Sequence, residues 1–182
     1  MLNHKGTQFI QTDRLILRRL TSQDTDNFFA QLVNDKRVLK YTAWPYHEKP
    51  EQTKKMLDSW SHAYERPAFY NWGIEFEGKI IGNITVYRIY EDTSAMEIGY
   101  CFGYGYWNRG FATEAAKAVI NFLFDEIGAQ KIIISYAHKN PASGRVAEKC
   151  GMTYVSTAPN AFTTADGEVV DIIEYEKNRC DN

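Results

Sequence analysis

The chain has 182 residues of mixed charge and a formal net charge of −2. This suits one globular domain and argues against a nucleic-acid binder, because no basic cluster stands out. Its three cysteines and four histidines lack disulfide-framework or metal-ligand spacing, so we expect no metal and a reducing, cytoplasmic compartment. No apolar stretch is long enough to span a bilayer and no signal-peptide core is present, so we expect no membrane partner.

The first part of the chain is expected to form one strand and two helices. Residues 15–20 have a strand pattern, and a helix over 21–34 follows, with a threonine cap and an early aspartate. An aromatic loop over 41–46 precedes a second helix over 50–64. Proline at its start and glutamate in its first turn favour that helix.

A hairpin and a further strand come next. Residues 72–76 and 80–90 flank the turn Glu77-Gly78, in which glycine supplies the positive φ. The strand 96–102 then continues the sheet in the antiparallel sense.

Helices and strands alternate in the second half. Residues 111–127 carry apolar side chains at helical spacing and end at Gly128. The strand 131–137 is expected parallel to 96–102, because a helix joins the two. The connector 158–168 has no clear pattern. A short helix over 141–149 and strands over 153–157 and 169–175 complete a mixed sheet with helices on both faces.

The most informative run extends from Trp107 to Glu114 and reads Trp-Asn-Arg-Gly-Phe-Ala-Thr-Glu. It follows the strand 96–102, and the next helical pattern begins inside it. Unpaired N–H groups at a helix start bind phosphorylated ligands when the backbone can come close. Gly110 and Ala112 allow that approach, because neither has bulk beyond Cβ.

This run differs from two other phosphate-binding loops. Asn108 stands where a dinucleotide fingerprint requires its third glycine. Phe111-Ala112 stands where a P-loop requires Lys-Ser/Thr. Taken alone, the run is explained more simply by an ordinary capped helix.

A second run extends from Asn140 to Met152 and reads Asn-Pro-Ala-Ser-Gly-Arg-Val-Ala-Glu-Lys-Cys-Gly-Met. Two further blocks are Glu97-Ile98-Gly99-Tyr100 and the opening Thr12 to Arg18. Together these four collinear blocks resemble the GNAT acetyltransferases, most closely the branch that acetylates ribosomal protein N-termini. The resemblance implies an α/β fold in one domain over residues 1–182. Its mixed, mostly antiparallel sheet would have about seven strands, with 96–102 and 131–137 splayed into a cofactor cleft.

The resemblance also implies acetyl-CoA as the cofactor. Backbone amides near Gly110 would hold its diphosphate, and Arg109 could add a positive charge. Asn140 would bond the pantetheine arm, although helix capping is the alternative for this residue. For Arg145 the alternative is an exposed helix arginine. The predicted cofactor contacts are Phe102, Asn108, Arg109, Gly110, Phe111, Ala112, Thr113, Asn140 and Arg145.

Alternation over 96–102 places Glu97, Gly99 and Cys101 on one face of the strand. A carboxylate beside small residues suits a cleft floor, although a solvated strand charge would give the same pattern. The resemblance makes Glu97 the base, acting through water. It makes the Cys101 N–H the donor that polarises the thioester carbonyl.

The Cys101 thiol is not expected to carry the acetyl group, because no histidine adjoins it in the sequence to lower its pKa. A small buried strand residue is the expected role of this side chain. Many GNAT enzymes place a tyrosine acid where Ala147 stands. The resemblance suggests Ser143 as the substitute.

The expected acceptor is a protein N-terminal amine. Deprotonating an α-amine at pH 7 costs about 1.4 kcal/mol, against about 4.6 kcal/mol for a lysine amine. Trp44, Tyr46 and Trp72 could line the acceptor groove, although aromatic side chains are more often core. A small-molecule amine acceptor, a non-catalytic acyl-CoA-binding module and a general phosphate-ligand binder remain alternatives, and the protein is expected to be a monomer or homodimer.

Overall fold

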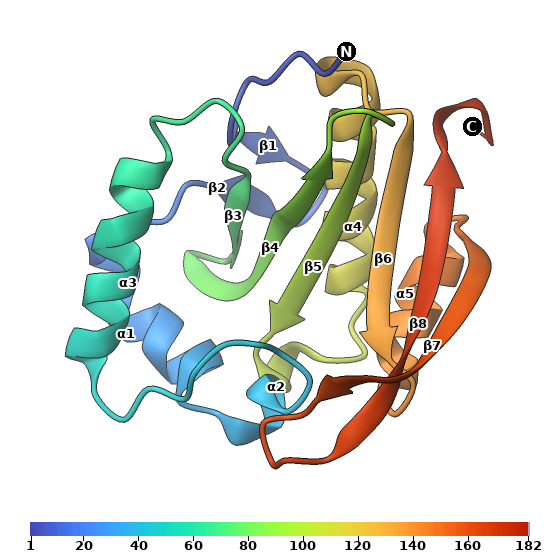
Figure 1. Cartoon of the computed structure of the whole chain (residues 1–182). Helices are drawn as coiled ribbons and strands as arrows, with labels where there is room; N and C mark the ends of the chain where they lie inside the picture. Colours follow the sequence, from blue (N-terminus) through green and yellow to red (C-terminus); the bar gives the residue numbers. More distant parts are fainter. Residues whose placement is uncertain (182) are drawn as a thin grey trace.

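The computed structural model describes residues 1–181, which contain eight strands in one mixed sheet (Figure 1). The strand order is β1-β2-β3-β4-β5-β6-β8-β7. Neighbouring strands are antiparallel except for the pair β5 and β6. The predicted fold class, mostly antiparallel with one parallel pair, is confirmed.

The first part of the chain contains one more strand and one more helix than the sequence predicts. A two-residue strand is too short to show alternation, and the extra helix has a single turn. The Asp35 side chain caps that turn by accepting the Arg37 N–H at 2.9 Å. The elements are β1 (Ile10–Gln11), β2 (Ile16–Arg18), η1 (Ser22–Asp24), α1 (Thr25–Phe28), η2 (Phe29–Val33), α2 (Lys36–Leu39) and α3 (Pro50–Ala63).

The predicted hairpin and the antiparallel strand that follows it are confirmed. They form β3 (Asn71–Phe76), β4 (Lys79–Tyr90) and β5 (Ala95–Phe102). Both turn residues, Glu77 and Gly78, have positive φ of 49° and 74°. Two successive positive φ values match the right-handed twist of the flanking strands.

The second half also follows the predicted order. Gly128 and Gly151 end the two helices with φ of 81° and 73°. Strand β7 is longer than predicted and takes up much of the connector that had no clear pattern. The elements are η3 (Tyr104–Tyr106), α4 (Phe111–Phe122), η4 (Leu123–Ile127), β6 (Lys131–Ala137), α5 (Pro141–Lys149), β7 (Thr153–Thr163), β8 (Val169–Asn178) and η5 (Arg179–Asp181).

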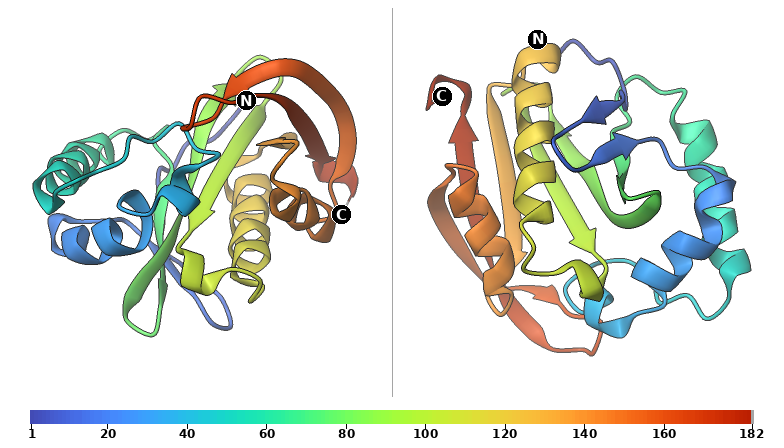
Figure 2. Two further views of the ribbon diagram at one scale, coloured as in Figure 1. Left: turned by 90° about the horizontal axis from the view of Figure 1, so that it is seen from below. Right: turned by 180° about the vertical axis from the view of Figure 1, so that it is seen from behind.

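Helices cover both faces of the sheet. Figure 2 shows α4 and α5 on one face and α1 and α3 on the other. The main core lies under α4, whose Phe111, Ala115 and Val119 belong to one cluster with Met96 and Ile98 of β5. A second, smaller cluster lies on the opposite face and includes Phe28, Leu32 and Leu57.

Strands β5 and β6 pair over only three residues each. Ala95–Glu97 pairs with Lys131–Ile133. Beyond this point β5 stays with β4 as far as Phe102, while β6 stays with β8 as far as Ala137. The two parallel strands therefore diverge, and the predicted splay is confirmed. We call the opening between them the fork; its closed end is at Glu97 and its open end lies beyond Phe102.

Candidate active site

The closed end of the fork holds the Glu97 carboxylate. Its side chain is only 5% exposed, so it is not a solvated strand charge. Oε1 accepts hydrogen bonds from the Ser135 hydroxyl, at 2.6 Å, and from the Tyr87 hydroxyl. Oε2 lies 3.3 Å from Nη1 of Arg88. The carboxylate therefore connects β5 to both of its neighbouring strands.

A β-bulge in β4 creates this arrangement. The register between β4 and β5 shifts between Val86 and Arg88, which leaves Tyr87 as the extra residue. Val86 is buried against the α4 side of the sheet. Tyr87 and Arg88 then both contact Glu97 from the opposite face. Regular alternation would have sent Arg88 back into the core.

The register also decides which peptide groups face the fork. The Gly103 N–H donates to the carbonyl of Ile81 in β4 at 2.8 Å, and the same register pairs Cys101 with Asn83. In an antiparallel pair alternate residues exchange hydrogen bonds, so the Cys101 N–H is directed at β4. This argues against Cys101 as the oxyanion donor. The residues whose N–H groups face the fork beyond its closed end are Tyr100 and Phe102.

The open end of the fork is built from backbone. Asn108 and Gly110 both have positive φ, of 59° and 81°. Gly110 is the N-cap of α4, and no side chain caps the helix there. The first N–H groups of α4 are therefore available to an anion, with the positive end of the helix dipole behind them.

A side-chain brace holds this loop in place. Arg14 binds Glu114 of α4, with Nη2 2.6 Å from Oε2, and its Nη1 donates to the Arg109 carbonyl at 3.1 Å. The Thr12 hydroxyl donates to the other Glu114 oxygen at 2.6 Å. Sequence reasoning found Thr12 and Arg14 only as motif residues. The sequence feature that could have indicated this brace is Glu114, an acidic residue in the first turn of α4.

The other predicted side chains at the open end are mostly used for packing. The Arg109 guanidinium lies 4.9 Å from the Phe111 ring centroid and also faces Phe76 and Tyr106. The Phe102 side chain is buried in the main core. The Arg109 side chain is thus packed against aromatic rings. The groups of this loop that could bind a diphosphate are its backbone amides.

At the start of α5, Asn140 and Ser143 contact each other. Asn140 Nδ2 donates to the Ser143 hydroxyl at 3.1 Å, and the Asn140 side chain does not cap the helix. The Tyr100 hydroxyl donates to the Ser143 carbonyl at 3.2 Å and thus links β5 to α5. Arg145 is exposed on the same helix.

The Cys101 thiol is held in its neutral form. Burial raises its pKa to about 12, although an N–H of Asn83 works in the other direction. A thiolate is the nucleophilic form of cysteine. We therefore assign no covalent role to this sulfur.

Only part of the predicted aromatic acceptor groove fits the structure. The prediction for Trp72 is wrong, because its side chain is fully buried and its Nε1 donates to the Gln8 carbonyl at 2.7 Å. Trp44 packs against Phe28 of the smaller core cluster. Tyr46 is 40% exposed. The core alternative therefore accounts for Trp72, whereas Trp44 is half-buried at the edge of the smaller cluster.

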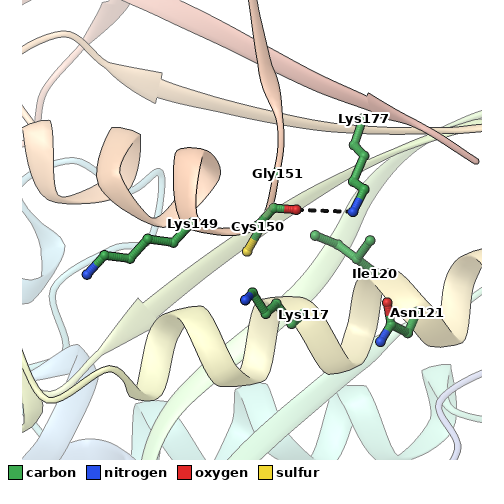
Figure 3. A pocket seen from close by; sticks show the side chains of 7 residues that line it. All are labelled: Lys117, Ile120, Asn121, Lys149, Cys150, Gly151 and Lys177. Carbon is green, nitrogen blue, oxygen red and sulfur yellow. Dashed lines mark hydrogen bonds between the residues drawn. The ribbon is translucent and has the colours of Figure 1, made fainter. Parts of the chain in front are cut away.

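A lysine-lined hollow of about 360 Å³ lies elsewhere on the protein, and none of the predicted site residues lines it (Figure 3). Lys117 of α4, Lys149 at the end of α5 and Lys177 of β8 surround it. Lys177 donates to the Cys150 carbonyl at 3.3 Å, as expected for a cation at the negative end of a helix. We call this surface the lysine hollow.

Two further properties concern residues 1–181, the part of the chain that the structure describes. No helix in this part of the chain is long and apolar enough to cross a membrane. Within the same residues, no group of three or more His, Cys, Asp or Glu side chains is placed to hold a metal ion. The fork has Glu97 at its closed end and the run Asn108–Thr113, which leads into α4, at its open end.

A family model described as an acetyltransferase (GNAT) domain matches residues 14–153. The chain belongs to the GNAT acetyltransferase family. It is an N-acetyltransferase, and GNAT acetyltransferases use acetyl-CoA. The uncharacterized N-acetyltransferase YoaA of Bacillus subtilis is 33% identical to this GNAT enzyme over 144 residues, which are 78% of this chain and 81% of YoaA.

Solved structures share its fold. RimL, a ribosomal L7/L12 alpha-N-protein acetyltransferase in complex with coenzyme A, has a TM-score of 0.85 and 18% identity, covering 94% of this chain and 98% of RimL. MccE, the microcin C7 self immunity acetyltransferase in complex with acetyl-CoA and AMP, has a TM-score of 0.83 and 20% identity, covering 92% and 93%. Identities this low establish the common fold alone.

Proposed function

We propose that this GNAT enzyme acetylates a protein N-terminal α-amine by direct attack in a ternary complex. The observation that carries the mechanism is the buried Glu97 carboxylate at the closed end of the fork. It lies on the face opposite α4, because its neighbours Met96 and Ile98 pack under that helix. Acceptor and cofactor thus approach from opposite faces and meet in the fork.

The residues present fit coenzyme A. Amides of Asn108–Thr113 would take the diphosphate, since the start of α4 has no side-chain cap. The fork would take the pantetheine arm, with the N–H groups of Tyr100 and Phe102 and the Asn140 side chain as hydrogen-bonding partners. Acetyl-CoA supplies the thioester.

Each chemical task then has a group in this chain. Glu97 receives the proton of the acceptor amine. The Tyr100 N–H, which faces the fork, would stabilise the negative charge that develops on the thioester carbonyl oxygen during attack. The Ser143 hydroxyl is the proposed proton donor to the sulfur, although a thiol of pKa about 8.5 also leaves tolerably well as thiolate.

Two observations support an α-amine as the acceptor. The four sequence blocks resemble the ribosomal branch of the family, and the fold matches RimL, whose name states a protein α-amine substrate. The energetic argument agrees, because an α-amine costs about 3 kcal/mol less to deprotonate at pH 7 than a lysine amine. A single carboxylate is sufficient for the smaller task.

A small-molecule amine is the second candidate. The likeness to MccE, a self immunity acetyltransferase, favours it. Acetylation of a panel of unstructured peptides and small amines separates the two. We expect peptides with free α-amines to turn over faster than the same peptides with blocked N-termini and free lysines. Turnover of small amines without turnover of any peptide would replace the first candidate by the second.

A further inference from the structure

We propose that the Tyr87 hydroxyl, in place of a water molecule, carries the proton from the acceptor amine to Glu97. This inference rests on the proposed role of Glu97 as the base. It assigns a catalytic role to a residue that the family resemblance does not mark. Three features of the structure carry it: the bulge, the closure of the carboxylate and the position of the tyrosine ring.

The bulge directs Tyr87 at the base. As the extra residue of β4, Tyr87 has no cross-strand partner in β5. Its hydroxyl donates to Glu97 Oε1. Bulges redirect side chains in this way and are over-represented next to active sites.

The carboxylate itself is closed off. Its side chain is 5% exposed, whereas Tyr87 is 50% exposed. Glu97 Oε1 is shared by the Tyr87 and Ser135 hydroxyls, and Oε2 faces Arg88. An incoming ammonium therefore meets one of these groups before it meets the carboxylate. Arg88 has no acceptor atom, so only the two hydroxyls can take up a proton.

The ring position favours Tyr87 over Ser135. A Cβ added to Gly99 would lie 3.1 and 3.2 Å from two carbons of the Tyr87 ring. The ring therefore covers Gly99, the residue next to Tyr100, whose N–H is the proposed oxyanion donor. This places the phenol on the part of β5 where the reacting carbonyl would lie. Ser135 approaches the carboxylate from β6, on the other arm of the fork.

The proton transfer balances without a further reactant. One N–H bond of the ammonium breaks and its proton passes to the Tyr87 oxygen. The Tyr87 O–H bond breaks at the same time, and that proton passes to Glu97 Oε1. Amine, tyrosine and glutamic acid all end neutral. Burial and the hydrogen bond to Glu97 raise the pKa of Tyr87, so the phenol stays protonated and ready to donate at neutral pH.

The test is Tyr87→Phe, which keeps the ring and removes the hydroxyl. Turnover is measured with three acceptors that have the same peptide scaffold and differ in the basicity of the reacting amine. The amine is an alkyl amine, an α-amine or an alkoxyamine. We expect kcat/KM to fall at least about tenfold for the alkyl amine and the α-amine. The alkoxyamine, already unprotonated at pH 7, should react within about threefold of the parent rate.

Ser135→Ala is the matched control, because it removes the other hydroxyl donor to the same oxygen. We expect it to slow all acceptors to a similar extent, with no selection against the basic amines. Unchanged turnover of Tyr87→Phe with every acceptor would overturn the relay, and so would a uniform loss with every acceptor, which indicates a structural role. If Glu97→Gln also leaves turnover unchanged, the base assignment itself fails. If only Glu97→Gln is impaired, the proposed function stands and the relay falls.

Discussion

The two ends of the fork are built from different material. At the closed end, three side chains from β4 and β6 converge on the carboxylate of Glu97. At the open end, the proposed cofactor site consists of backbone amides in a loop with two positive φ values. A side-chain substitution should therefore impair chemistry at the closed end. At the open end, only a substitution that strains the loop backbone or removes its support should have an effect. That effect should be weaker binding of acetyl-CoA.

Glu97→Gln should have the largest effect. The amide has nearly the shape of the carboxylate but cannot take up the proton of the amine. We expect kcat to fall about 100-fold or more, with the affinity for coenzyme A nearly unchanged. Steady-state kinetics and calorimetric titration measure the two quantities. A large loss of affinity would mean that the ends of the fork are not separate in function.

Gly110→Ala should give the opposite pattern. A residue with a side chain is strained at the φ of 81° found here, by about 1–2 kcal/mol. We expect the KM for acetyl-CoA to rise about tenfold and kcat to stay nearly unchanged.

Gly105→Ala is the matched control in the same loop. A Cβ at Gly105 would meet nothing within 4 Å, and this glycine has no positive φ. We expect the control to behave like the parent enzyme. Equal effects of the two substitutions would argue against a backbone grip centred on Gly110.

Arg14→Ala should have a smaller effect in the same direction. It removes the brace that joins Glu114 to the Arg109 carbonyl, so the loop loses support but keeps its own geometry. We expect the KM for acetyl-CoA to rise about threefold, because exposed ion pairs contribute up to about 1 kcal/mol. Lys54→Ala, which breaks the exposed pair with Asp58, controls for a general loss of surface charge and should leave KM unchanged.

Cys101→Ala should have the smallest effect. The thiol is neutral, with a pKa of about 12, and the Cys101 N–H is directed at β4. We expect kcat within about threefold of the parent value. Initial-rate kinetics should show the pattern of a ternary complex, in which both substrates bind before any product leaves. Loss of activity combined with ping-pong kinetics would instead indicate a covalent acetyl-cysteine.

The same contrast explains what could be predicted from the sequence. The open end was predictable, because glycine and small residues before a helix have a direct backbone meaning. The alternation that separates Glu97 from Met96 and Ile98 was also visible, and so was the order of the main strands. Each of these signals is local in the chain.

The closed end was not predictable in the same way. The bulge at Tyr87 breaks alternation without any glycine or proline to signal it. The contact between Ser135 and Glu97 joins residues 38 positions apart. The buried position of Trp72 and the direction of the Cys101 N–H likewise depend on tertiary packing and register. Such features follow from strand pairing, which a single sequence does not specify.

The most direct test of the account is a crystal structure of the protein with coenzyme A. We predict that the diphosphate lies on the amides of Asn108–Thr113 and that the pantetheine arm runs between β5 and β6, with its sulfur beside the Tyr100 N–H. The lysine hollow formed by Lys117, Lys149 and Lys177 is the competing anion-attracting surface. Coenzyme A bound in that hollow, with the fork empty, would contradict the account.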